Sequence, residues 1–131
     1  MTYQFTIFGR LANLNDYLKA ERVAIRTTSG RFTTKGNNLK HNTQKGIVGA
    51  IRRDLGGLHI NRPIKLHYKF YEPNKKRDMD NVWAFASKCT QDSLVVAGVL
   101  DNDGWEQITG ISAEFFVDKD NPRIEVFLIE D

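Results

Sequence analysis

The stretch of residues 64–71 constrains the fold more than any other part of this chain, because apolar and polar side chains alternate along it without a break. A period of two is typical of a β-strand whose two faces meet different surroundings. The pattern predicts a strand with one face in the core and the other face basic and aromatic. The apolar face carries Ile64, Leu66, Tyr68 and Phe70, and the opposite face carries Lys65, His67, Lys69 and Tyr71.

Three other segments, residues 3–8, 107–117 and 123–129, also have the alternation of strands. Helical spacing of apolar residues predicts three helices. The resulting order, β-α-α-β-α-β-β, predicts an α+β fold: a single domain over residues 1–131 with a small mixed, mainly antiparallel sheet packed by helices.

The expected helices are bounded by capping residues and glycines. Residues 27–38, between the first two helices, are rich in Thr, Gly, Ser and Asn and are expected to form a loop. The first helix is expected to begin at a cap at Asn13 or Asn15 and to end at about Leu18 or Val23. The second is expected over about residues 39–55, before Gly56. The third is expected to run from an N-cap at Asp80 to about Ala97, before Gly98.

The net charge of +3 hides an uneven distribution. Residues 26–77 hold 13 Lys and Arg against two acids, and residues 78–131 hold 12 acids against three Lys and Arg. A basic half favours binding to a polyanion, and an acidic half can hold cations. Opposite charges can also simply hydrate two faces of a protein, so the motif at the change of sign carries more weight than the charge itself.

Composition argues against several other classes of protein. No apolar run approaches the roughly 20 residues of a membrane span, and the amino end lacks the features of a secretory signal. The one cysteine, Cys89, allows no internal disulfide and fits a reducing cytoplasm. Three scattered His do not predict a zinc site, and no glycine-rich nucleotide loop is present. We expect a cytoplasmic protein with no membrane contact and no small-molecule cofactor.

The sign of the charge changes at residues 78–81, Asp-Met-Asp-Asn, which follow the basic segment 75–77 and open a predicted helix. In an extended chain, Asp78 and Asp80 would point to the same side. Helix capping explains one of these acids but not both. A second acidic cluster, residues 101–103, follows the helix, in a composition that is also typical of a turn. Carboxylates beside a basic surface predict metal-assisted chemistry on a phosphodiester.

These segments, taken in order, resemble the RusA family of Holliday-junction resolvases. The family has three motifs in a fixed order: Asp-x-Asp-Asn, then Lys-x-x-x-Asp-x-Leu, then Gly-Val followed by a pair of acids. Residues 77–81, 88–94 and 98–103 match these motifs in that order. The amino end at residues 5–15 and the carboxyl end at residues 115–126 also look like that family. The resemblance therefore spans nearly the whole chain.

The resemblance implies a metal site and a DNA-binding surface. Mg²⁺ is the implied cofactor, with Mn²⁺ as a substitute. The family's paired acids appear here as Asn102 and Asp103 after an additional Asp101, so either Asp could be the principal ligand at this end. The implied catalytic residues are Asp78, Asp80, Asp103 and Lys88. The implied metal ligands are Asp78, Asp80, Asp103, Asp92 and Asp101. The expected DNA-binding residues are Arg26, Arg31, Lys35, Lys40, Lys45, Lys75, Lys76 and Arg77.

Lys88 departs from the family spacing, since it lies seven residues after Asn81, about four more than is commonest. Four residues are about one helical turn, roughly 6 Å, so Lys88 keeps its face but moves along the axis. The positive charge could come instead from the basic segment 75–77. Lys88 and Asp92 could also form a simple exposed pair at a spacing of four residues.

Trp83 and Trp105 flank the acidic segments. Packing in the core or in a dimer interface is the expected role of both, with base stacking as the alternative.

The resemblance implies a homodimeric, Mg²⁺-dependent endodeoxyribonuclease that resolves four-way DNA junctions by symmetric paired nicks, leaving 5′-phosphate and 3′-hydroxyl ends. The implied setting is DNA recombination and repair in a bacterial or bacteriophage-infected cell. Two sites related by a two-fold axis suit a substrate with its own pseudo-two-fold symmetry. Two alternatives stay open: a catalytically silent nucleic-acid-binding homologue, and a nuclease that acts on another branched DNA or on RNA.

Overall fold

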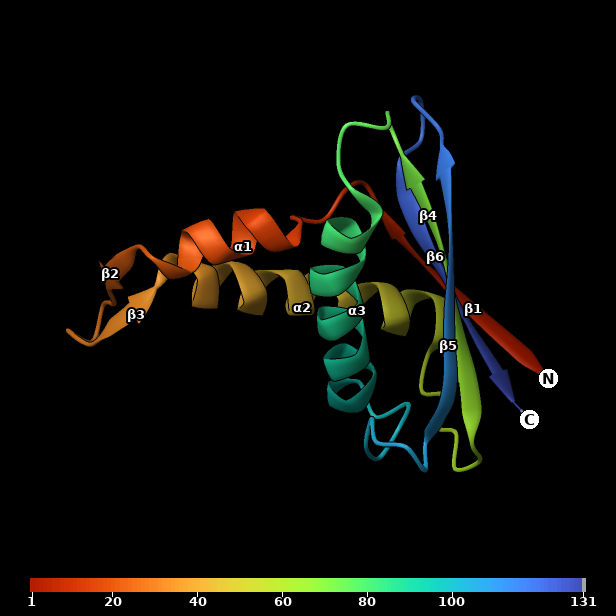
Figure 1. Cartoon of the computed structure of the whole chain (residues 1–131). Helices are drawn as coiled ribbons and strands as arrows, with labels where there is room; N and C mark the ends of the chain where they lie inside the picture. The colour runs from red at the N-terminus through yellow and green to blue at the C-terminus, as the bar shows by residue number, and fades with distance from the viewer. Residues whose placement is uncertain (131) are drawn as a thin grey trace.

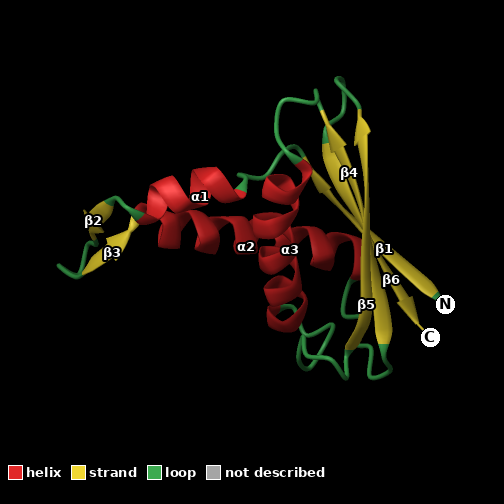
Figure 2. Ribbon diagram, in the orientation of Figure 1, coloured by secondary structure: helices red, strands yellow, loops and turns green. Residues whose placement is uncertain are grey.

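Three helices lie on one side of a mixed four-stranded sheet in this computed structural model, which describes residues 1–130 (Figures 1 and 2). The strands are β1 (Thr2–Phe8), β6 (Arg123–Glu130), β4 (Ile64–Glu72) and β5 (Ile108–Val117), in that order across the sheet. β6 pairs antiparallel with both β1 and β4, whereas β4 pairs parallel with β5. The predicted α+β class and the mixed, mainly antiparallel sheet are confirmed.

The alternation in β4 has the predicted consequence. Leu66, Tyr68 and Phe70 are fully buried under the helices. On the opposite face, the Lys69 ammonium lies 5.3 Å from the centre of the Phe127 ring, and the Arg123 guanidinium lies 3.7 Å from that of Tyr71. The outer face of the sheet is thus basic and aromatic, as expected.

Helix α3 (Met79–Val96) connects the parallel strands β4 and β5, as such a pair requires a crossover. Trp83 packs edge-on against Tyr68, with ring centres 4.9 Å apart, so the expected core role of this tryptophan is confirmed. Cys89 is also fully buried in this layer. Burial raises the pKa of its thiol to about 11, which fits an inert core residue.

The carboxyl end of α3 lies where the sequence predicted it, but the amino end begins at a different capping residue. The helix ends at a C-cap at Ala97, and Gly98 follows with a φ of 79°, as predicted. The N-cap is Asp78 rather than Asp80, and its side chain makes no capping hydrogen bond. Asp80 therefore lies in the first turn, and the two acids are not neighbours on one side of an extended strand.

Residues 27–38 do not form the single loop that their composition predicts. Two short strands, β2 (Ala24–Arg26) and β3 (Phe32–Thr34), form a hairpin, and α2 (Lys35–Leu55) begins directly after it. Thr34 caps α2 by accepting the Asn37 backbone N–H at 2.9 Å. The predicted loop is therefore confined to residues 27–31.

Helix α1 (Leu14–Glu21) begins after Asn13, whose side chain caps it together with Asp16. This confirms one of the two predicted caps. α1 packs beside the amino-terminal part of α2, which carries the β2–β3 hairpin away from the sheet (Figure 1). We refer to β2, β3 and residues 27–45 as the arm. None of the helices in residues 1–130 is long and apolar enough to cross a membrane.

Candidate metal and nucleic-acid site

Asp78 opens onto a cavity of about 600 Å³ at the amino end of α3. Within the described chain, no hydrogen bond or ion pair engages the Asp78 carboxylate, and Asp80 accepts only the neighbouring Asn81 N–H, at 3.0 Å. Both acids are exposed. The other lining residues come from the β4–α3 loop, α3 and the end of β5: Glu72, Asn74, Lys75, Arg77, Met79, Val82, Phe115, Phe116 and Val117.

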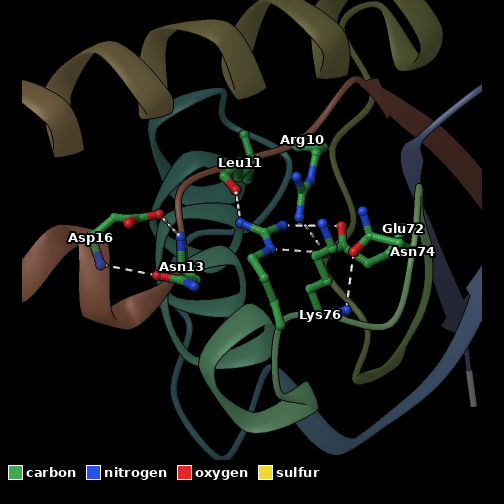
Figure 3. A network of polar contacts seen from close by, with 8 residues as sticks. Arg10, Leu11, Asn13, Asp16, Glu72, Asn74 and Lys76 are labelled. Atoms are coloured by element: carbon green, nitrogen blue, oxygen red, sulfur yellow. Dashed lines mark hydrogen bonds and ion pairs between the residues drawn. The ribbon is translucent and has the colours of Figure 1, made fainter.

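An ion-pair cluster fixes the loop that presents Asp78 (Figure 3). Arg77 donates two hydrogen bonds to Glu72, at 2.8 and 3.0 Å, and a third to the Leu11 carbonyl at 2.8 Å. Arg10 adds a hydrogen bond to Glu72 at 3.2 Å. Burial raises the pKa of the Glu72 carboxyl, but hydrogen bonds from Arg77 and Arg10 outweigh it and hold that pKa below its usual range.

We refer to Arg77, Glu72 and Arg10 as the clamp, and it changes the expected role of Arg77, which the sequence had suggested as a DNA contact. The Arg77 side chain is only 16% exposed and is held by three acceptors, so it serves the loop rather than an external phosphate. Lys75 and Lys76 remain exposed beside Asp78. The Asn74 side chain accepts the Lys76 backbone N–H at 3.0 Å, which shapes this turn (Figure 3). The structure thus leaves two cations next to the acidic pair.

The second acidic cluster lies at the opposite end of α3. The helix has 18 residues and is therefore about 27 Å long. Asp101 contacts His59, with the two side chains 3.0 Å apart. Asp103 lines a different cavity, of about 540 Å³, together with Gln91 and Trp105. A single chain does not bring these acids to Asp78.

The separated acids do not converge on one point within the described residues. Among residues 1–130, no group of three His, Cys, Asp or Glu side chains is placed to hold a metal ion. The signal was available in the sequence, because a helix predicted from Asp80 to Ala97 already implies a separation of about 25 Å. The order of the motifs by itself does not give the distance between the two acidic clusters.

The Lys88 and Asp92 side chains contact each other and lie far from Asp80. The Lys88 ammonium is 3.2 Å from an Asp92 oxygen, across one helical turn. From α2, Lys40 approaches Asp92 to 3.8 Å and the Gln44 amide donates to it at 3.2 Å. Asp92 follows Asp80 by 12 residues, roughly 18 Å along the axis. The structure therefore places this pair at the α2–α3 contact.

The remaining predicted DNA contacts all lie on the arm. Arg26 and Arg31 flank the turn of the hairpin, where the Thr27 N–H donates to the Arg31 carbonyl at 2.7 Å. Lys35, Lys40 and Lys45 follow on α2 at intervals of five residues. That interval turns successive side chains by roughly 140°, so the lysines surround the helix rather than lining one face.

The fold and site together describe a small α+β protein with a pair of open carboxylates beside exposed lysines, and with a basic arm. No family model matches the chain, and no curated protein matches it in sequence. Membership of the RusA family therefore stays a prediction from the motifs.

Proposed function

We propose that this protein is a Mg²⁺-dependent endonuclease that cleaves four-way DNA junctions. The observation that carries the proposal is the pair of exposed carboxylates, Asp78 and Asp80, which have no ionic partner within residues 1–130 and lie close in sequence to Lys75 and Lys76. Acids without partners contribute little to folding stability, whereas they are suited to hold a cation. The resemblance to RusA resolvases supplies the substrate class.

The donor set at the amino end of α3 fits Mg²⁺. This ion keeps several waters and is usually bound by one or two protein carboxylates together with substrate phosphates. Asp78, which lines the cavity, and Asp80, two residues further along in the first turn of α3, would supply such oxygen ligands, and the cavity beside Asp78 would leave room for water and phosphate. Bound there, Mg²⁺ would activate a water for attack and neutralise charge on the phosphate.

The cations around the site have separate tasks. Lys75 lines the same cavity as Asp78, so it is placed to bind a phosphate oxygen and to oppose negative charge that builds up on it. Arg77 positions the loop through Glu72 and does not bind DNA. Arg26, Arg31 and Lys35 bind more distant phosphates, which orients the junction without reading its sequence.

Asp103 can join the acidic pair only if a second copy of the chain supplies it, because α3 separates them within one chain by about 27 Å. The proposed enzyme is therefore a homodimer with two equivalent sites. Such a pair of sites matches the paired strands of a four-way junction.

The replacement Asp80→Asn tests the proposal. It removes a charged ligand but preserves size, so we expect cleavage of a labelled four-way junction to fall at least about 100-fold, of the order seen when a catalytic group is removed. Junction binding, measured by gel shift in Ca²⁺, should be unchanged or tighter because repulsion of the phosphates is lower. Full activity in this variant would remove Asp80 from the metal site.

A second candidate is a nucleic-acid-binding protein without catalysis. It is favoured by the lack of a three-ligand metal cluster within residues 1–130 of a single chain. Such a protein would bind the junction with the same salt dependence but would not need Mg²⁺. A nuclease for another branched DNA or for RNA would share the site chemistry, and parallel assays on those substrates distinguish it.

A further inference from the structure

Phe32, on strand β3 of the arm, is a large apolar side chain that projects into solvent. It is 75% exposed and is not among the residues that pack on the core. Within the described chain, no aromatic ring or cation stacks on it, whereas the exposed ring of Phe8 has the Arg53 guanidinium 5.1 Å from its centre. Single exposed apolar residues are common, so the surroundings of the Phe32 ring decide what it can do.

A hydrogen-bonded turn presents this ring. The Thr27 N–H donates to the Arg31 carbonyl at 2.7 Å, and the Thr27 hydroxyl accepts the Arg31 N–H at 3.2 Å. Gly30 closes the turn with a φ of 84°, a conformation that favours glycine. β3 then leads directly into α2, where the Thr34 hydroxyl donates to Glu21 of α1 at 2.7 Å. Both ends of β3 are therefore fixed, which lowers the cost of ordering the ring on a ligand.

The surroundings of Phe32 are uniformly basic. The arm, residues 24–45, contains five Lys and Arg and no acid. Arg26 is the cross-strand partner of Phe32, so the two side chains leave the hairpin on the same face. Arg31 precedes the ring and is also exposed. This combination fits a ligand with negative charge and a flat apolar surface, which is the chemistry of a nucleic acid with an exposed base.

Trp105 is the contrasting case. Its ring is 96% exposed, so the core packing expected of it does not occur within this chain. Asp103 lines the same cavity as Trp105, and Glu106 follows it in the sequence. Carboxylates without a bound cation repel a phosphate backbone, so Trp105 lacks the environment that Phe32 has.

We propose that Phe32 stacks on a base exposed at the branch point of a four-way junction, while Arg26 and Arg31 bind the phosphates on either side of that base. Inside a duplex each base is covered on both faces, and inserting a ring there requires unstacking. At a branch point a base can lose one stacking neighbour, so the ring finds a free face at less cost. The inference rests on the proposed function, since it concerns the same substrate, and adds the residue that distinguishes a junction from a duplex.

The position of the arm makes this a second contact with the junction, separate from the metal site. The hairpin lies at the end of α2 that is far from the sheet (Figures 1 and 2). Asp78 lies at the amino end of α3, beside the end of β5. Phe32 would thus position the junction and take no part in the chemistry. Its replacement should change junction binding and selectivity but not the metal dependence of cleavage.

A junction that carries the fluorescent base 2-aminopurine at the branch point tests the inference. In Ca²⁺, binding of the full chain should change the fluorescence of this probe, and the same probe in the middle of a duplex arm should not respond. Phe32→Ala should abolish the branch-point signal and weaken junction binding by about 10-fold, the effect of one lost stacking contact, while binding to linear duplex of matched sequence changes by less than about twofold.

Two further variants control for effects on folding. Phe32→Trp keeps a stacking ring, so it should retain the signal and bind the junction within about twofold of the unaltered chain. Leu18→Ala removes a different apolar side chain, 45% exposed on α1, and should change neither quantity. Circular dichroism melts show whether each variant is folded.

The outcomes separate this inference from the proposed function. An unchanged branch-point signal in Phe32→Ala would overturn the stacking contact, as would an equal loss of junction and duplex binding that Phe32→Trp does not restore. Binding to anionic lipid vesicles that depends on Phe32, without any response of the probe, would assign the ring to a membrane surface instead.

Cleavage in Mg²⁺ completes the comparison. A chain that gives the Phe32-dependent signal but cleaves no junction supports the stacking contact and contradicts the proposed nuclease. A chain that cleaves junctions with the same selectivity after Phe32→Ala supports the nuclease and overturns the stacking contact.

Discussion

The pair formed by Arg77 and Glu72 decides where the acidic site is held. Both side chains are largely buried, 16% and 13% exposed, and together they tie the end of β4 to the start of α3. Without this pair, the loop that presents Asp78 would be held mainly by its short turn at Asn74. The residue that the sequence suggested as a DNA contact is thus the one that positions the site.

We expect Arg77→Ala to lower the free energy of unfolding by about 2–4 kcal/mol, because it leaves the Glu72 carboxylate partly buried with only Arg10 as an ionic partner. Urea denaturation followed by circular dichroism measures the change. Lys76→Ala, one residue away on the exposed side of the loop, should change stability by less than about 0.5 kcal/mol. Equal effects in the two variants would contradict the clamp.

The two lysines proposed for the catalytic charge can be separated. Lys75 lines the Asp78 cavity, whereas Lys88 lies about two helical turns beyond Asp80 on α3 and pairs there with Asp92. We expect Lys75→Ala to reduce the single-turnover rate of junction cleavage by about 100-fold, as for other groups that stabilise transition-state charge. Lys88→Ala should cost only a few-fold. The reverse ranking would return Lys88 to the role implied by the family spacing.

At the scale of elements, the arm is a separate electrostatic unit. Its basic residues lie away from the acidic pair, so their effect should be on binding rather than on chemistry (Figure 1).

We predict that Arg26→Ala and Arg31→Ala each weaken junction binding and each lower the slope of log affinity against log salt by about 0.9, the value for one lost phosphate contact. Fluorescence anisotropy at several salt concentrations measures both quantities. Arg52→Ala is the control, because it lies at the opposite end of α2 from the arm. An unchanged slope in both arm variants would remove the arm from the DNA surface.

Elements with a long, regular pattern could be predicted from the sequence, and short ones could not. The strand at residues 64–72 and the helix after Asp78 have enough periods for burial to determine their type. β2 and β3 have three residues each, too few to show a period, and their Thr-rich composition resembled a loop. Thr34 then starts α2 four residues earlier than expected, because its side chain provides a cap that the composition concealed.

At the scale of the whole molecule, the candidate site could be predicted only in its parts. The motif order indicated which acids to examine, and Asp78 and Asp80 are indeed open to solvent. A motif records order and not distance, so the separation of about 27 Å between Asp103 and these acids follows only from the length of the helix between them, which the sequence did predict. Alternation could not show that β5 is parallel to β4 and lies at an edge, since pairing depends on contacts distant in sequence.

Cleavage of a labelled synthetic four-way junction in Mg²⁺ and in EDTA, beside linear duplex of matched sequence, tests whether the protein is a junction endonuclease. We predict paired, symmetric nicks that require Mg²⁺ and occur on the junction alone. Tight binding to the junction with no cleavage at any Mg²⁺ concentration would contradict the proposed nuclease activity. It would favour a nucleic-acid-binding protein without catalysis.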